Sequence, residues 1–154
     1  MNNDVINLGL VLRNFENFNM TNFDGRLTLQ KSIYLMQAFG IYLGYNFSWY
    51  LRGPYSPRLA RDGFALQEIY RSVPTSSFEK KNIQSKFEKF LNFMEDKKKD
   101  PDRLEILASI HFLKKIHKNM SKSEILEKVK KKQVYFTKKE CKKAWNELRE
   151  IELI

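Results

Sequence analysis

The residue types that most often carry enzymatic chemistry are few in this sequence and poorly spaced for it. The two histidines, His111 and His117, stand six positions apart in one predicted helix. Six residues rotate a helix by about 600°, so the two rings face different sides and cannot bind one metal ion from that helix alone. We expect His111 to be partly buried with a hydrogen-bond partner, and His117 to lie near a helix C-terminus, where protonation is favoured.

The remaining candidates also give no constellation. The single cysteine, Cys141, falls on the apolar stripe of a predicted helix, which favours a small buried residue over a nucleophile. Three acids, Asp24, Asp62 and Glu68, are scattered without a visible partner, and the chain lacks a phosphate loop, GxSxG, CxxC and HExxH. The sequence therefore predicts a non-enzymatic protein without metal or cofactor. An enzyme whose site the sequence does not reveal is kept as an alternative.

The densest local pattern is WYLRGPYSPRLARD, residues 49–62, where a short aromatic strand meets a helix. Gly53 allows a φ that other residues resist, and Pro54 fixes the next one. Ser56 is a good N-cap for a helix whose first residue is a proline. This predicts a stiff structural motif, which Gln30 and Lys31 of the preceding helix would support through hydrogen bonds to carbonyls of the turn; its members are Gln30, Lys31, Trp49, Gly53, Pro54, Ser56 and Pro57.

The same turn is also a candidate interaction surface. Tyrosine and arginine are the residues most favoured at the centre of protein interfaces. A stiff turn that points such side chains outward would bind a partner through Tyr50, Arg52, Tyr55 and Arg58. The sequence leaves open whether the turn is a binding surface or only a scaffold.

Mainly helical structure is expected around this turn: about seven helices with a minor β element, in a single domain over residues 1–154. An apolar helix is predicted over 4–18, and a second begins at Thr28 and ends at Gly40 or Gly44. Residues 46–53 alternate as a strand, with Phe47, Trp49 and Leu51 inward and a pairing segment near 71–75 or 134–136.

Further helices are predicted from cap signals. Proline follows the cap at Ser56 and at Asp100, and the first of these helices should turn Leu59, Phe64 or Ala65, and Ile69 inward. Capping boxes pair Ser76 with Glu79, Ser121 with Glu124 and Thr137 with Glu140. The stripes expected to be buried are Phe87, Phe90, Leu91 and Met94; Leu104, Leu107, Ala108, Ile110 or His111, and Leu113; and Cys141, Ala144, Trp145 and Leu148.

Two of these segments carry a family resemblance. The stretches LQKSIYLMQAFG and FSWYLRGPYSPRLARD, within residues 26–70, resemble the YwgA-like family of small prokaryotic proteins. They are more distantly similar to the Panacea domain of SocA-like antitoxins, which has the Leu-Gln-Lys helix and a tryptophan followed by Gly-Pro. The Panacea resemblance implies neutralisation of a toxin by direct binding. Tyr55-Ser56-Pro57 departs from the more aliphatic segment of those antitoxins and lies closer to the YwgA-like form, which implies no activity.

Charge is distributed unevenly and supports a second hypothesis. Of the net +10, residues 1–77 carry +2 and residues 78–154 carry +8, whereas 13 of the 21 aromatic residues lie in the first part. An aromatic, motif-bearing half (1–75) thus precedes a basic helical half (76–154) that packs on it. The last three predicted helices have the order of a helix-turn-helix or winged-helix unit. Its candidate nucleic-acid contacts are Lys130, Lys131, Lys132, Lys138, Lys139, Lys142 and Lys143.

The leading hypothesis is a cytoplasmic protein-binding module, antitoxin-like or an adaptor, with a toxin-like or regulatory protein as partner. The lone cysteine fits a reducing compartment, and no apolar run is long enough to cross a membrane. The alternative is a nucleic-acid-binding protein, active in transcription regulation or in defence against phage and mobile elements. The sequence identifies neither the partner nor the oligomeric state.

Overall fold

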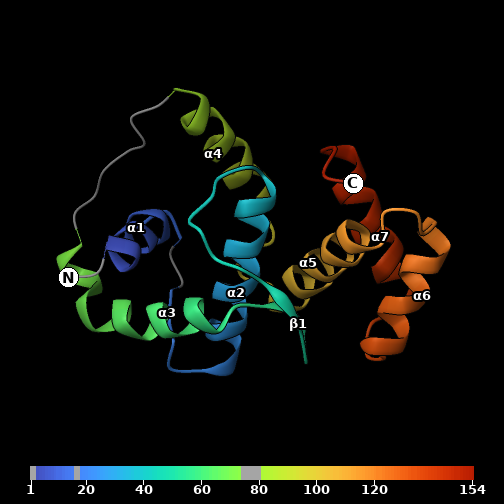
Figure 1. Cartoon of the computed structure of the whole chain (residues 1–154), viewed down its shortest axis with the longest axis horizontal. Coiled ribbons are helices and arrows are strands. Elements are labelled where there is room, and N and C mark those ends of the chain that lie inside the picture. The colour runs from blue at the N-terminus through green and yellow to red at the C-terminus, as the bar shows by residue number, and fades with distance from the viewer. Residues whose placement is uncertain (1–2, 16–17, 74–80) are drawn as a thin grey trace.

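The computed structural model describes residues 3–15, 18–73 and 81–154. This part of the chain is mainly helical, as predicted, with seven α-helices, a short 3-10 helix and one two-stranded sheet (Figure 1). The elements in chain order are α1 (Asn3–Leu12), α2 (Phe23–Ala38), β1 (Ser48–Tyr50), β2 (Gly53–Tyr55), α3 (Pro57–Ile69), η1 (Tyr70–Ser72), α4 (Lys81–Met94), α5 (Pro101–Ile116), α6 (Lys122–Lys132) and α7 (Lys138–Glu150).

Two long helices, α2 and α5, pack against each other and join the two parts of the fold. The pair α1 and α3 lies on one side, with α3 also against α2, and α6 and α7 pack on α5 and on each other (Figure 1). Helix α4 contributes Phe90, whose ring packs on those of Phe15 and Phe39. The buried apolar side chains form one cluster with members from both halves, such as Leu8 and Leu148.

The β element differs from its prediction. It is a hairpin in which β1 pairs antiparallel with β2, Trp49 opposite Pro54, so the partner strand is neither of the two segments proposed. Because β1 ends at Tyr50, Leu51 does not continue the inward alternation but lies in the turn, 75% exposed. Trp49 is half-buried, less than expected, and Tyr50 is 57% exposed.

Two helices near the hairpin also differ. Helix α2 begins five residues before Thr28, because Asn22 caps it by accepting from the N–H of Gly25. Helix α1 ends at Leu12, well before residue 18. Helix α3 buries Leu59 with the small and polar residues 62 and 63 and with Leu66, so the predicted inward positions Phe64 and Ala65 are exposed and Ile69 is only half-buried.

Cap predictions in the C-terminal half are confirmed. Asp100 accepts from the N–H of Arg103, and both capping boxes, Ser121 with Glu124 and Thr137 with Glu140, are complete. The predicted Ser76–Glu79 box lies outside the described residues. Of the predicted stripes, all members are buried except Leu91 and His111, which are half-buried.

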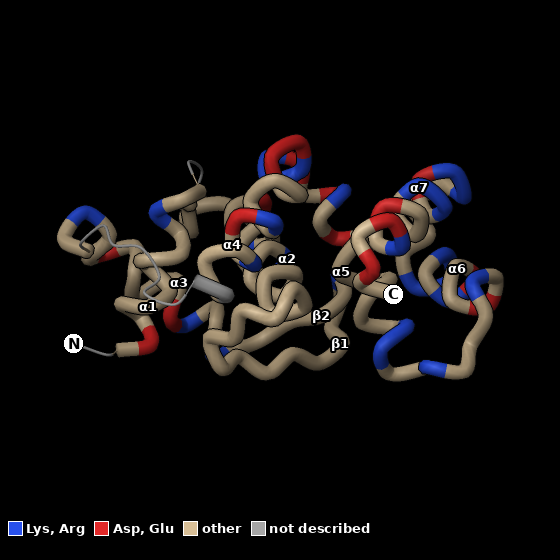
Figure 2. Tube along the Cα trace, turned by 90° about the horizontal axis from the view of Figure 1, so that it is seen from above, with Lys and Arg blue, Asp and Glu red and all other residues tan. Residues whose placement is uncertain are grey.

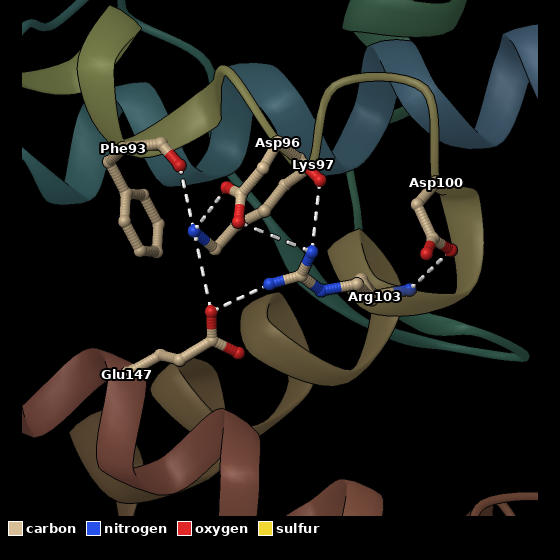
Figure 3. A network of polar contacts seen from close by, with 6 residues as sticks. All are labelled: Phe93, Asp96, Lys97, Asp100, Arg103 and Glu147. Carbon is tan, nitrogen blue, oxygen red and sulfur yellow. Dashed lines mark hydrogen bonds and ion pairs between the residues drawn. The ribbon is translucent and has the colours of Figure 1, made fainter.

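A network of charge ties the link between α4 and α5 to α7 (Figure 3). The ammonium of Lys97 lies 2.9 Å from Asp96 Oδ1 and 3.3 Å from Glu147 Oε2. The guanidinium of Arg103 lies 2.7 Å from Glu147 Oε2 and 3.6 Å from Asp96 Oδ2. The lysine-rich link is therefore fixed to the core by paired charges. None of the helices in the described part has the length and apolar character needed to cross a membrane.

Candidate functional site

The hairpin and the start of α3 are held in place by two polar side chains of α2. The amide of Gln30 donates to the carbonyl of Ser56 and accepts from its N–H, both at 2.9 Å. The ammonium of Lys31 donates to the carbonyl of Pro54 at 2.6 Å. Both side chains are buried, so α2 supplies partners for backbone groups that water cannot reach. The predicted support of the turn by Gln30 and Lys31 is confirmed.

Backbone conformation explains the Gly-Pro-Tyr-Ser-Pro sequence. Gly53 has a φ of +97°, and a Cβ on it would come within 2.4 Å of Ser109 Oγ on α5. Glycine is therefore required both for the left-handed conformation and for close approach to α5. Ser56 then caps α3 by accepting from the N–H of Leu59, with Pro57 at the first helical position, as predicted.

A buried carboxylate from α5 lies beside this hairpin. The side chain of Glu105 is fully buried, and its Oε1 lies 3.4 Å from Nη1 of Arg52. Its Oε2 accepts from Nε2 of Gln133 at 2.8 Å and from the hydroxyl of Tyr135. The guanidinium of Arg52 also lies over the rings of Phe23 and Tyr135. The hairpin tip thus contacts the loop between α6 and α7 through Glu105.

Lys31 belongs to the same electrostatic environment but is less well paired. Its side chain is 1% exposed, and within the described part of the chain no carboxylate lies within 4 Å of it. Burial lowers the pKa of Lys31 to about 8; Glu105 raises it in part and Arg52 lowers it further. A buried ammonium normally has a carboxylate partner, because desolvation disfavours the charged form.

A cavity of about 540 Å³ opens beside the hairpin, with mostly apolar walls. Its lining comes from the loop before α2, from α2, from both strands and their turn, and from α3. Four large apolar side chains at its edge are exposed to about half or more; we call them the apolar rim: Phe23, Tyr50, Leu51 and Phe64. Among the described residues of the lining, the charged ones are Arg26, Lys31 and Arg52, and none is acidic.

Three of the four predicted partner-binding residues share this cavity. Tyr50, Arg52 and Tyr55 line it, and the rings of the two tyrosines lie 5.2 Å apart. Arg58 does not line it. Its guanidinium is occupied by Asp4 at 2.7 Å and by the carbonyl of Gly44 at 2.7 Å, which makes it a structural contact between α3 and α1.

Sequence reasoning missed several members of this site. Phe23 precedes Thr28, the predicted start of α2, and Phe64 was one of two alternative inward positions on α3. The exposure of both depends on how α2 and α3 pack. Glu105 gave a signal that could have been used: it is the only acid in the apolar run LEILASIHFL. A lone carboxylate in a buried helix requires partners, and these are Arg52, Gln133 and Tyr135.

The predicted nucleic-acid contacts on α7 are exposed, whereas two of those on α6 contact other groups of the chain. On α7, Lys138, Lys139, Lys142 and Lys143 are all exposed, opposite the buried stripe that contains Cys141 and Trp145, and Figure 2 shows cations on α6 and α7. Two lysines of α6 are engaged elsewhere. Lys130 donates to the carbonyl of Phe136, and the ammonium of Lys132 lies 5.3 Å from the centre of the Trp49 ring.

A second cavity, of about 720 Å³, lies between α2 and α5. At its wall Tyr34 and Nδ1 of His111 form a 2.7 Å hydrogen bond, so His111 has the partner that was expected. Burial lowers the pKa of His111 to about 4, with a contribution from Lys115. Lys114 donates to two backbone carbonyls. This cavity is larger, but among its described lining residues only Tyr42 is an exposed large apolar side chain.

Residues 3–15, 18–73 and 81–154 contain no group of three or more His, Cys, Asp or Glu side chains that could hold a metal ion. No family model matches the chain, and no curated protein or solved structure shows significant similarity to it. The resemblance to YwgA-like proteins therefore stays a prediction from the sequence.

Proposed function

We propose that this protein is a cytoplasmic binding module that acts by direct contact with a protein partner, as an antitoxin-like protein or an adaptor, and not as an enzyme. The observation that carries the proposal is the apolar rim. Among the described residues, nine large apolar side chains are exposed, and four of them surround one cavity. Exposed apolar residues are ordinary when scattered, but a contiguous group next to a cavity is typical of interaction sites.

The scaffold beneath the rim supports this role. Gln30 and Lys31 fix the hairpin backbone, and Gly53 packs directly on α5. A surface that is already rigid loses little conformational entropy when a partner binds. Tyr50 and Arg52 then offer large contact areas at the hairpin tip, as residues at interface centres do.

Site-specific photo-crosslinking tests the proposal. The crosslinker p-benzoylphenylalanine is placed at Leu51 in the rim or at Ile116, an exposed apolar residue at the end of α5, and irradiated in cells of the source organism. We expect one protein to be crosslinked from position 51 and not from position 116. That protein, purified, should bind the Phe64→Asp variant at least tenfold more weakly than wild type and bind Ile116→Asp normally. The same adducts from both positions would contradict the proposal.

A second candidate function, nucleic-acid binding, is favoured by the face of α7. Positions 138, 142, 146 and 149 recur along one side of this helix, so Lys138, Lys142, Asn146 and Arg149 share an exposed face. Helices α5, α6 and α7 pack on one another, as the helices of a helix-turn-helix domain do. In such a domain α7 would be the recognition helix in the major groove. Such a protein would serve in transcription regulation or in defence against mobile elements.

Fluorescence anisotropy with duplex DNA at about 50 mM salt tests this candidate. Replacing Lys138, Lys139, Lys142 and Lys143 by glutamine should weaken binding to all sequences and reduce the salt slope by about one for each lost phosphate contact. Replacing the exposed Lys86 and Lys89 of α4 is the control and should change little. Equal effects of the two sets for each lysine replaced would mean that binding follows net charge and not the face of α7.

A further inference from the structure

The cavity beside the hairpin has a charge imbalance that indicates what it binds. Three cations, Arg26, Lys31 and Arg52, line it, and none of its described lining residues carries a carboxylate. The nearest carboxylate that the structure pairs with any of them is that of Glu105, which lies outside the lining and also accepts from Gln133 and Tyr135. One buried negative charge therefore serves both Lys31 and Arg52.

The hydrogen-bonding capacity of these cations is largely unused within the described part of the chain. Arg52 has one long contact, 3.4 Å from Nη1 to Glu105. Arg26 donates from Nη1 to the carbonyl of Met20 at 3.1 Å, and Lys31 donates to that of Pro54. A guanidinium has five N–H donors in a fork that matches a carboxylate, so Arg52 retains the geometry for a bidentate contact.

The surroundings of Arg52 add an apolar requirement. Its guanidinium lies 5.1 Å from the centre of the Phe23 ring, and Phe23 belongs to the apolar rim together with Tyr50 and Phe64. A ligand that reaches Arg52 must therefore also cover apolar surface. The lining is far more apolar than a site for a free inorganic anion, which would gain nothing from these side chains.

We infer that the cavity receives a segment of the protein partner in which a carboxylate side chain stands next to an aromatic or large aliphatic one. The carboxylate pairs with Arg52, in the positive field of Arg26 and Lys31, and the apolar side chain packs against the rim. This inference rests on the proposed function, because it assigns the carboxylate to the protein that the rim binds.

Two small probes of equal shape test the carboxylate requirement: 3-phenylpropanoate and its neutral analogue 3-phenylpropanamide, titrated against the full chain by NMR. We expect the acid to bind in the millimolar range, to shift resonances of Phe23 and Tyr50, and to bind at least tenfold more tightly than the amide. Arg52→Met should abolish this preference. Arg61→Met, which removes an equal charge from an exposed position of α3 outside the cavity, should leave it intact.

A second variant separates loss of fold from loss of site. Ala60→Trp places a bulky side chain in the cavity from α3, leaves the three cations in the chain, and should exclude both probes while the chain stays folded by circular dichroism. Equal affinity of wild type for acid and amide, or retention of the acid's preference in Arg52→Met, would overturn the inference while leaving the proposed function standing.

Competition identifies the source of the carboxylate. The acid, and not the amide, should weaken reversible binding of the purified partner that the crosslink identifies. An acid that binds selectively yet leaves partner capture unchanged would mark a site for free carboxylic acids and would overturn the assignment to a protein segment. Failure of the crosslinking itself, with selective acid binding retained, would instead refute the proposed function.

Discussion

Two clusters of charged side chains lie on opposite faces of α5. They differ in whether each cation has a carboxylate partner. Arg103 and Glu105 are two residues apart, which is about 200° of helical rotation. On the Arg103 side, two cations face two carboxylates, and each cation lies within 4 Å of both (Figure 3). On the Glu105 side, Lys31 and Arg52 have one carboxylate between them, and only Arg52 approaches it within 4 Å among the described residues.

The matched cluster has an evident structural purpose, because it fixes the α4–α5 link to α7 and satisfies its own charges. The unmatched cluster fixes the hairpin too, but it leaves positive charge beside a cavity with an exposed apolar rim. A charge that a fold buries without a full partner costs stability, and such a cost is tolerated most readily where a ligand completes the pairing. The difference therefore separates a structural network from a candidate binding site.

Removal of one carboxylate from each cluster should give the largest contrast in stability. Glu105→Gln removes the carboxylate that raises the pKa of Lys31 and should lower the free energy of unfolding by about 3 kcal/mol. Glu147→Gln should cost only about 1 kcal/mol, because Lys97 and Arg103 both keep Asp96 and the site is partly solvated. Urea denaturation measures both. Equal costs would mean that the two clusters are matched equally well.

Removal of a lysine should cost more stability in the matched cluster than in the unmatched one, the reverse of the order for the carboxylates. Lys97→Met takes away a cation that contacts two carboxylates, the carbonyl of Phe93 and its ring, and should cost about 2 kcal/mol. Lys31→Met loses one hydrogen bond but also relieves a poorly compensated buried charge, so we expect a change within about 1 kcal/mol. A Lys31 variant less stable than the Lys97 variant would indicate that Lys31 has a better counter-charge than Glu105 provides.

Local chemistry made most of the helical fold predictable from sequence. Capping depends on two or three neighbouring residues, so the starts of α3, α5, α6 and α7 were predicted correctly. The hairpin was not, because its return strand contains Pro54, and a proline argues against a strand except at an edge. The start of α2 was missed because Asp24-Gly25 resembles a turn, although Asn22 is a good cap.

The site was predictable only where backbone groups of the turn require hydrogen-bond partners. A stiff turn has carbonyls that require donors, which pointed to Gln30 and Lys31. The cavity depends instead on the rotation of α2 and α3, and a shift of one position in the inward face of α3 moves Phe64 from core to rim. Arg58 shows the opposite case. An arginine is favoured at interfaces, so it was predicted to bind a partner, but its guanidinium donates to Asp4, which is distant in the sequence.

The pH dependence of stability gives the smallest and most specific test of the unmatched cluster. Because burial lowers the pKa of Lys31 to about 8 from an unfolded value near 10.5, the unfolded chain binds more protons between these values. The free energy of unfolding should therefore rise with pH over this window, and at pH 9 it should be about 1 kcal/mol higher than at pH 7. Burial also raises the pKa of Cys141 and of Tyr34, which lowers stability as pH rises past 9 and hides part of this gain.

Those groups are common to wild type and Lys31→Met, so the difference between their urea-unfolding curves at pH 7 and 9 isolates Lys31. The wild type should gain about 1 kcal/mol relative to the variant between these two pH values. Parallel pH dependences for wild type and Lys31→Met would contradict a lowered pKa of Lys31 in the folded chain.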